Sequence, residues 1–318
     1  MCFVSPTIMS NPVDYIHKYP HRSKQILGIS YKAFLQLVQQ ASLRQSQQRS
    51  RLEQTKIRVN GRGGGRKQIL STEAAVGLCL FYLRHLPTFE ILGIQFGISK
   101  TSANDIFHYW LEILREVLPA SLLEQVKNQV NDYEIVQEIL QEFELLVDST
   151  EQPRERPRDY KEQEKFYSGK KKQHTFKNQL IILPEAEDIV DVIAGRPGTV
   201  SDINLLRQQQ KKFSAGQQFK GDKGYIGADN VATPYKKPRN QELSETKKQE
   251  NKVFSSSRIL IEHLIRLVKV FQIAAQRFRL RPQTYQQVIL TICGLVRCRI
   301  GALVLPIEIS EKRVIAMS

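Results

Sequence analysis

The sequence predicts an α/β protein in which an all-α domain precedes a domain built around a sheet. Two observations carry this prediction. Residues 69–118 show helical periodicity throughout, and short apolar runs bounded by turn residues begin only at residue 143. With 318 residues and a hydrophobic fraction of 41%, the chain is long enough to form two cores.

These changes of pattern predict five segments along the chain. The acid-rich residues 121–142 read as helical, which is typical of a connector between domains. The segments are an N-terminal arm with a basic linker at 1–66, a helical domain at 67–120, the helical connector at 121–142, a sheet-containing domain at 143–305 and a C-terminal tail at 306–318.

The charge of the chain indicates its partner. A formal net charge of +15 favours a polyanion, and we expect nucleic acid rather than an anionic membrane surface, because no basic amphipathic anchor is evident. No run of about 18 apolar residues occurs, so we expect no membrane span. The four cysteines have neither disulfide nor zinc-site spacing. They predict free thiols in a reducing compartment. We expect a cytoplasmic protein, associated with the nucleoid if the host is bacterial.

The first 67 residues hold one predicted helix, at 31–48, between two irregular stretches. Residues 1–23 contain three prolines and little periodicity, which predicts a loose arm. In residues 49–67 four glycines alternate with basic residues, without the Gly-x4-Gly-Lys-Ser/Thr spacing of a nucleotide-binding loop. We expect either a plain linker or a flexible basic turn on DNA backbone. The candidate phosphate contacts of such a turn are Arg62, Arg66 and Lys67.

Residues 69–118 read as three helices, at 73–84, 88–96 and 100–117. Gly97 provides a turn before the third helix, and Ser99 can cap that helix. A helix, a tight turn and a second helix with an exposed polar first turn is the pattern of a helix-turn-helix, although a structural helical bundle shows it too. The candidate contacts to bases and phosphates are Lys100, Thr101, Ser102 and Asn104.

From residue 143 onward, apolar runs alternate with turn residues. The first run ends on Asp148, which we expect at the end of a central strand, where sites on such sheets form. Further strands are predicted at 169–183, 189–194 and 217–220, with a helix at 202–211 and a last helix at 285–300. Asp222 follows the fourth strand in a glycine-containing turn. Three strands, a helix, a fourth strand and then helices is the order of the ribonuclease-H-like fold.

Residues 255–271 read as one helix, with serines that can cap its start. At about 100° per residue, its charged residues apart from His263 fall within an arc of about 80°, and the other residues of the helix are mostly apolar. A helix that is apolar almost all round is buried, so this charged stripe needs a partner. An ordinary core helix with a solvated edge is the alternative. The stripe consists of Arg258, Glu262, Arg266 and Lys269.

Four stretches hold these residues in a fixed order. They are LLVDSTE at 145–151, YSGKKKQHTFKNQ at 167–179, GDKGYIG at 221–227 and SRILIEHLIRLVKVF at 257–271. In this order they resemble the DDE transposases of bacterial insertion sequences and related DDE superfamily endonucleases with a helix-turn-helix. Arg258, Glu262 and Lys269 match the family's Arg-x3-Glu-x6-Lys spacing, and Ser255 stands where many members have tyrosine. The resemblance covers residues 65–300 and implies a ribonuclease-H-like catalytic domain.

The resemblance also implies a carboxylate site for two Mg²⁺ ions, with Mn²⁺ able to substitute. Asp148 would bridge both ions, Asp222 would bind one and Glu262 the other. Oxygen ligands suit such hard cations, and two ions about 3.5–4 Å apart can hold the attacking and leaving oxygens of an in-line displacement. Nearby basic residues would contact DNA phosphate or orient a carboxylate. They are Lys170, Lys171, Lys172, Arg258 and Lys269.

We therefore expect a Mg²⁺-dependent transposase that binds element ends, cleaves DNA phosphodiesters and joins the freed 3′ hydroxyl to target DNA. Its expected partners are double-stranded DNA and further copies of the chain, as a homodimer or higher oligomer on DNA. Two alternatives remain open. One is a structure-specific endonuclease of the same fold without strand transfer. The other is a catalytically silent DNA-binding protein derived from a transposase.

Overall fold

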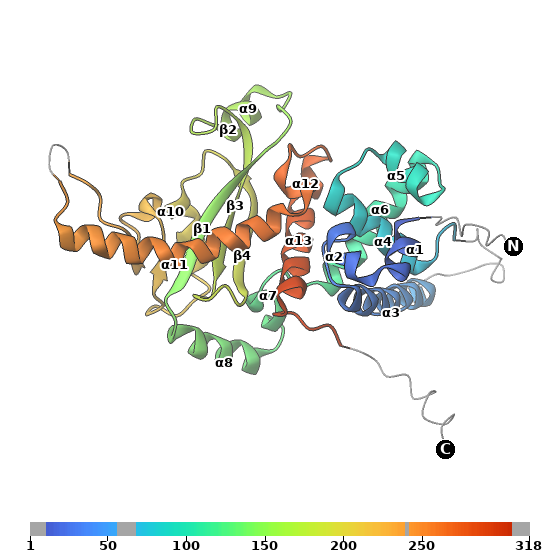
Figure 1. Ribbon diagram of the computed structural model, residues 1–318, viewed down its shortest axis with the longest axis horizontal. Helices are drawn as coiled ribbons and strands as arrows, with labels where there is room; N and C mark the ends of the chain where they lie inside the picture. Colours follow the sequence, from blue (N-terminus) through green and yellow to red (C-terminus); the bar gives the residue numbers. More distant parts are fainter. Residues whose placement is uncertain (1–10, 56–67, 239–241, 307–318) are drawn as a thin grey trace, which may run out of the picture. The chain divides into compact units, whose positions relative to one another are not determined.

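A computed structural model describes residues 11–55, 68–238 and 242–306 of the chain, which form two compact units (Figure 1). One unit contains the described residues up to Tyr82, Pro87–Val117 and the described residues from Leu303 onward. The other contains Leu83–Leu86 and Leu118–Ala302. The predicted order, a helical region followed by a sheet-containing region, is confirmed.

The described part of the first unit is helical. Its elements are α1 (Pro12–Lys18), η1 (Pro20–Arg22), α2 (Ser23–Ile26), α3 (Tyr31–Thr55), most of α4 (Thr72–His85), α5 (Phe89–Phe96) and α6 (Lys100–Val117). The loose arm predicted for residues 1–23 is wrong from residue 12 onward. Asn11 caps α1, because its side-chain oxygen accepts a hydrogen bond from the N–H of Val13 at 2.8 Å, and Ile16 is fully buried.

Local contacts define the two helices α5 and α6. The Oγ of Ser99 accepts a 3.1 Å hydrogen bond from the N–H of Ser102, so α6 is capped and begins where the sequence predicts. Gly97 ends α5 with a φ of 65°, in the left-handed region. A Cβ on Gly93 would lie only 2.6 Å from the carbonyl oxygen of Ile98. The tight helix-turn-helix geometry therefore depends on glycine at both positions.

The second unit is built on a six-stranded sheet. Its strands are β1 (Leu145–Pro153), β2 (Tyr167–Ser168), β3 (Gln173–Ile182), β4 (Ile189–Pro197), β5 (Phe219–Lys220) and β6 (Val231–Ala232). One edge of β3 pairs antiparallel with β1, and its other edge pairs antiparallel with both β2 and β4. β1 then pairs in parallel with β5, and β5 in parallel with β6. The long strands β1, β3 and β4 form the rigid centre of the unit.

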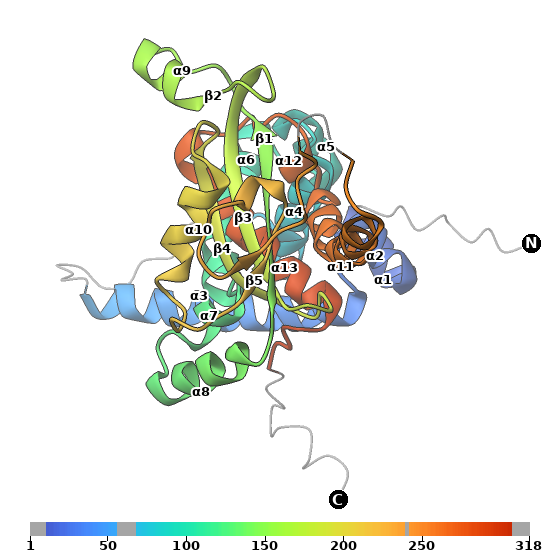
Figure 2. The same ribbon diagram turned by 90° about the vertical axis from the view of Figure 1, so that its left-hand side faces the viewer.

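Helices cover both faces of this sheet. They are α7 (Leu122–Val126), α8 (Val130–Gln141), α9 (Tyr160–Phe166), α10 (Asp202–Gln210), η2 (Lys223–Tyr225), α11 (Glu245–Lys269), α12 (Gln272–Ala275), η3 (Pro282–Thr284) and α13 (Tyr285–Ile300). Figure 2 shows the strands between α10 and α11. Val147 and Ile181 form a core with Leu206 of α10 on one face, and α11 packs against β1 on the other. The predicted helical connector is two helices, α7 and α8, separated at Gln129 by extended backbone.

The strand β1 is longer than predicted. It continues to Pro153 rather than ending at Asp148, because β3 supplies backbone partners along its whole length, as far as the pair Pro153–Thr175. Asp148 therefore lies within the strand, and the prediction of a carboxylate at a strand end is wrong. Rigid backbone on both sides of Asp148 holds its side chain more firmly than a strand end would.

The helix α11 also differs from its prediction. It begins at Glu245 rather than at the serines near residue 255, because the Ser244 side chain accepts a hydrogen bond from the N–H of Lys247 and caps it. Ile261 and Leu264 are buried, but Ile259 is 62% exposed. The expectation of a helix buried on almost all sides is therefore wrong, and α11 has one buried face and one open face.

Three cysteines lie within the described residues, and all are free thiols, as predicted. Cys79 and Cys293 are buried, and Cys298 is partly buried. Burial raises the pKa of the Cys298 thiol to about 12, so the reactive thiolate is scarce at neutral pH. None of the described helices is both long enough and apolar enough to cross a membrane.

Candidate active site

The candidate site lies where one edge of β1 loses its strand partner. β5 pairs with β1 only at Leu145 and Leu146, whereas β3 follows the opposite edge along the whole strand. The chain then turns at Gly221, where a Cβ would lie 2.6 Å from the Tyr225 ring. Only glycine fits so close an approach. The residue after this turn, Asp222, is near enough to Asp148 to influence its protonation.

The Asp148 carboxyl is largely buried, with 17% of its side chain exposed. Its Oδ1 accepts a 2.8 Å hydrogen bond from the N–H of Ser149. Burial raises the pKa of this carboxyl to about 6. The Ser149 hydrogen bond and Arg258 lower that pKa, whereas Asp222 and Asp202 raise it. Burial and the two neighbouring carboxylates therefore both disfavour the charged form of Asp148, and a bound cation would favour it.

On α11, one arginine faces two of the carboxylates. The Nη2 of Arg258 lies 3.9 Å from Oδ2 of Asp148 and 4.0 Å from Oε1 of Glu262. Both separations are long for ion pairs, and the buried Nε of Arg258 has no hydrogen-bond partner. The Glu262 side chain is 51% exposed. Arg258 thus links the strand carboxylate to the helix carboxylate without neutralising either by a close contact.

A cavity of about 340 Å³ opens beside these groups. Its lining consists of Asp148, Ser149, Thr150, Glu151, Lys170, Lys171, Lys177, Asp202, Glu262, Ile265, Arg266 and Lys269. Five predicted site residues therefore share it, whereas Asp222, Lys172 and Arg258 do not line it. Partial burial, followed by the charge of Lys171, lowers the pKa of the Lys269 ammonium. The cavity combines carboxylates with ammonium groups, a lining suited to cations and to phosphate.

The donor set fits a hard divalent cation in kind. Asp148, Asp222 and Glu262 offer only carboxylate oxygens, the ligands that such a cation prefers. Their arrangement fits a metal ion less well than their chemistry does. Among residues 11–55, 68–238 and 242–306, no group of three or more His, Cys, Asp or Glu side chains is arranged to hold a metal ion. The three carboxylates are thus suitable ligands in kind, but they do not form a metal-binding group in this arrangement.

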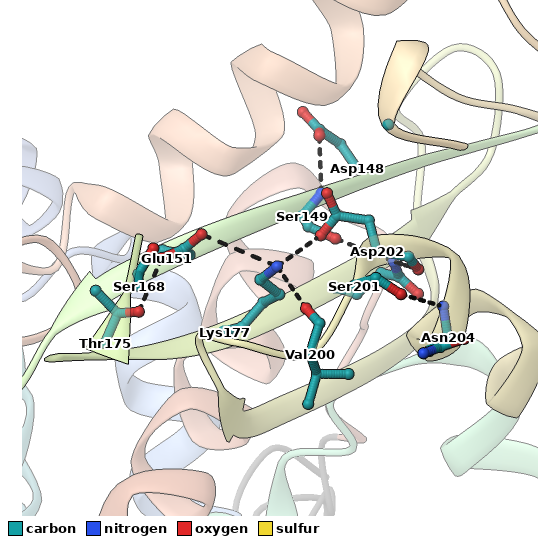
Figure 3. A network of polar contacts seen from close by, with 12 residues as sticks. Asp148, Ser149, Glu151, Ser168, Thr175, Lys177, Val200, Ser201, Asp202 and Asn204 are labelled. Carbon is teal, nitrogen blue, oxygen red and sulfur yellow. Dashed lines mark hydrogen bonds and ion pairs between the residues drawn. The ribbon is translucent and has the colours of Figure 1, made fainter. Parts of the chain in front are cut away.

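A buried network next to Asp148 escaped the sequence analysis. Lys177, on β3, lies 3.1 Å from Oδ1 of Asp202 and 3.9 Å from Oε1 of Glu151 (Figure 3). Thr175 donates a 2.8 Å hydrogen bond to the other oxygen of Glu151. The sequence predicts Asp202 as the first residue of the helix at 202–211 and does not indicate its contact with Lys177. The signal for the network was a lysine inside an apolar strand, because a buried charge needs a partner.

A second set of hydrogen bonds joins the elements beneath the site. The Nε2 of Gln179, with two N–H groups to donate, lies within hydrogen-bonding distance of three acceptors. They are the Ser149 hydroxyl at 3.0 Å, the Tyr225 hydroxyl at 2.9 Å and the backbone carbonyl of Asp202 at 3.0 Å. The Ser149 and Tyr225 hydroxyls also lie 3.0 Å apart. One glutamine therefore ties β1, the start of α10 and the turn that carries Asp222 to β3.

The four predicted DNA contacts in the first turn of α6 differ in exposure and in hydrogen bonding. Lys100 and Thr101 are exposed. Ser102 is half-buried, and its Oγ accepts a 3.0 Å hydrogen bond from the Oγ of Ser99, so it belongs to the helix cap. Asn104 donates a weak 3.3 Å hydrogen bond to the neighbouring aspartate. Lys100 and Thr101 are therefore more available to DNA than Ser102 and Asn104, which are both half-buried.

Two further basic segments were predicted to contact DNA. Arg62, Arg66 and Lys67 lie outside the described residues. Lys172 lies in the turn between β2 and β3, with a positive φ of 55° and its N–H donating to the carbonyl of Ser168 at 2.8 Å. It is exposed beside the cavity-lining lysines that precede it.

Comparison with family models matches both units of the chain. The model described as "DDE superfamily endonuclease" matches residues 147–297, which include Asp148, Asp222 and Glu262. The model described as "Helix-turn-helix of DDE superfamily endonuclease" matches residues 68–120, which include α5 and α6.

Individual relatives were found among curated proteins and solved structures. The chain is 31% identical over 225 residues to the probable transposase for insertion sequence element IS702 of Microchaete diplosiphon, covering 70% of this chain and 78% of that protein. Crystal structures of the mariner Mos1 paired end complex with Mg and of a pre-cleavage Mos1 transpososome share 14% and 12% identity. They cover 80% of this chain and 85% and 84% of theirs, with TM-scores of 0.18 and 0.17. Similarity that low supports no structural inference.

Proposed function

Because this chain belongs to the DDE-type insertion-sequence transposases with an N-terminal helix-turn-helix, we propose that it cuts and joins DNA at the ends of its element. In the first step, water attacks a phosphodiester and frees a 3′ hydroxyl. In the second, that hydroxyl attacks a phosphodiester of the target and becomes joined to it, releasing the target's own 3′ oxygen. Both steps are in-line displacements at phosphorus and need the same arrangement of charges.

The observation that carries this proposal is the set of carboxylates at the open edge of β1. Asp148 lies on a strand paired along its whole length, Asp222 follows the turn after β5, and Glu262 projects from α11. Asp148 and Glu262 line one cavity, and Arg258 lies within about 4 Å of both, which supports a shared role. Burial is the main cause of the raised pKa of Asp148, and the charge of Asp222 adds to it, which supports a place for Asp222 near Asp148. Carboxylates beside ammonium groups suit phosphodiester chemistry, because carboxylates can bind cations and ammonium groups can bind phosphate.

We propose that Asp148, Asp222 and Glu262 hold two Mg²⁺ ions, or Mn²⁺ in their place. Such ions would supply charge stabilisation for the attacking and leaving oxygens. Arg258 orients Asp148 and Glu262, to which it is nearest. Lys269, with Lys170, Lys171 and Lys172 from the turn before β3, binds DNA phosphates near the carboxylates.

We also propose that this unit has the ribonuclease-H-like fold. Its order of three antiparallel strands, a helix, a strand parallel to the first and then helices supports that assignment. The proposed boundaries remain 143–305 for this domain, 121–142 for the connector and 67–120 for the helix-turn-helix domain, with segments 1–66 and 306–318 at the ends.

The helix-turn-helix is the proposed reader of the element ends. Its support is the family match at residues 68–120 and the polar first turn of α6. Lys100, Thr101, Ser102 and Asn104 are the proposed contacts, and Arg62, Arg66 and Lys67 add phosphate contacts. Because two ends must be brought together before they are joined, we propose that the chain acts as a homodimer or higher oligomer on DNA.

A strand-transfer assay tests the proposal. Purified protein, Mg²⁺ and labelled duplexes that carry the inverted repeats flanking its gene should yield products joined to a target plasmid. The Asp148→Asn variant should yield none. Cleavage without joining would favour the alternative of a plain endonuclease, which the description of the matched family model suggests. Binding without cleavage would leave only a DNA-binding protein.

A further inference from the structure

Lys177 is a charged side chain buried in the sheet beside the proposed cation site. It lies on β3 within a fully buried run, and its side chain is only 8% exposed. Its Nζ donates to the Val200 carbonyl at 2.7 Å and lies 3.1 Å from Oδ1 of Asp202 (Figure 3). Glu151 completes the surroundings at 3.9 Å. An ammonium this deeply buried persists only where such partners offset its loss of water.

The Asp202 carboxylate connects Lys177 to the turn that carries Asp222. Asp202 is the first residue of α10, which Ser201 caps. Its second oxygen, Oδ2, lies 3.2 Å from the position that a Cβ on Gly224 would take, and Oδ1 of Asp222 lies 2.8 Å from the same position. Both carboxylates therefore lie against the same glycine, and Oδ1 of Asp222 accepts a 2.7 Å hydrogen bond from its N–H. The contact of Lys177 with Oδ1 of Asp202 is an ion pair without hydrogen-bond geometry.

The basic side chains near the site lie at different distances from the carboxylates that they face. Asp202 and Asp222 both act on Asp148, while Arg258 approaches Asp148 only to 3.9 Å. Lys177 is closer to its carboxylate than Arg258 is to either of its own. Among the described residues, Lys177 is the cation that pairs with Asp202, at 3.1 Å.

We propose that Lys177 acts as the resident counter-ion of the carboxylate site. Its ammonium pairs with Asp202 and offsets part of the negative charge that a bound divalent cation would offset. This role rests on the proposed function, because it presupposes a cation at Asp148, Asp222 and Glu262. It adds two residues to the site, Lys177 and Asp202.

The test compares stabilisation by Mn²⁺, which needs no DNA and no turnover. The melting temperature of the full chain is measured with and without Mn²⁺, and Mn²⁺ affinity is measured by electron paramagnetic resonance. Lys177→Met keeps a similar side-chain length but removes the charge. It should lower the melting temperature without metal, yet bind Mn²⁺ about tenfold more tightly than the parent and gain more from it.

The chain offers a matched control in the same unit. Lys212 forms a 2.8 Å ion pair with the buried Asp191, and neither residue lines the cavity. Lys212→Met should also lower the melting temperature, but its Mn²⁺ response should equal that of the parent. A merely structural role for Lys177 predicts the same result for both variants. An Mn²⁺ response of Lys177→Met that equals or falls below that of the parent overturns the proposal.

A second variant serves if Lys177→Met does not fold. Asp202→Asn removes the carboxylate that pairs with Lys177, and its Mn²⁺ affinity should fall about tenfold. An unchanged affinity would overturn the proposal while leaving the cation site in place. If the parent itself showed no Mn²⁺ response, the cation site of the proposed function would fall together with the role of Lys177. The two failures are therefore distinguishable.

Discussion

The first turn of α6 carries its proposed DNA contacts within five consecutive residues, whereas the carboxylates that line the cavity come from β1, α10 and α11. The α6 turn is shaped by contacts between residues three to five positions apart, such as Ser99 with Ser102. The cavity is shaped by strand pairing and helix packing over many tens of residues. DNA recognition and DNA cleavage should therefore respond differently to mutation. Single changes on α6 should reduce sequence discrimination by degrees, whereas loss of one carboxylate should abolish nearly all cleavage.

The largest expected effect is the loss of cleavage when a proposed ligand is removed. Asp148→Asn, Asp222→Asn and Glu262→Gln should each reduce cleavage by more than the roughly 10–100-fold that loss of an outer-shell partner costs. DNA affinity should stay nearly unchanged, since the contacts on α6 remain. Cleavage assays paired with gel-shift titrations measure both quantities. Glu134→Gln, an exposed acid on α8, is the control. Normal cleavage by any one of the three variants would remove that residue from the site.

A smaller effect is expected at Arg258, which orients ligands without binding the cation. Arg258→Ala should lower cleavage by about 10–100-fold, because Asp148 and Glu262 lose the guanidinium that lies between them. Arg277→Ala, which breaks an exposed ion pair with Glu155, should cleave like the parent. Single-turnover cleavage rates at saturating DNA distinguish the two. Equal rates for both variants would show that Arg258 has no part in the chemistry.

Changes on α6 should alter sequence discrimination in a graded way. The double change Ser102→Ala and Asn104→Ala should reduce the preference for element ends over random DNA by about 1–3 kcal/mol for each base that is no longer read. Most of that reduction should come from Asn104, because the Ser102 hydroxyl already accepts a hydrogen bond from Ser99. Competition binding with each single variant measures the split. Undiminished discrimination by the double variant would mean that another segment reads the ends.

The smallest effect on discrimination is expected for the basic residues before the helix-turn-helix domain. Replacing Arg62, Arg66 and Lys67 with Ala should weaken binding to end and random DNA alike. The log–log salt slope should fall by about 0.9 for each phosphate that the variant no longer neutralises. Binding at two salt concentrations checks this. Weaker binding to element ends alone would reassign these residues from backbone recognition to base recognition.

The two regions also differ in how far the sequence predicted them. Helix α6, helix α13 and the turn between β3 and β4 lie where the sequence places them. Each is defined by a cap, a turn or a periodic apolar face within a few residues. The candidate carboxylates were also predicted, but from the order of four motifs rather than from geometry. Their role in holding a cation stays a prediction.

Tertiary structure decided the features that depend on distant partners. β1 runs past Asp148 because β3 pairs with it as far as Thr175. Ile259 is exposed because only one face of α11 meets the sheet. Lys177 and Asp202 likewise meet beside the cavity because folding brings β3 and the start of α10 together.

By itself, the sequence thus determined the helix-turn-helix, the order of strands and helices, and the acidic residues available for chemistry. Those properties rest on capping, turn formation and side-chain type, which act within a few residues or within one side chain. Which carboxylates share a cavity, and which lysine offsets their charge, was decided only by folding. Burial and charge pairing are properties of groups that only the packed sheet brings within about 4 Å.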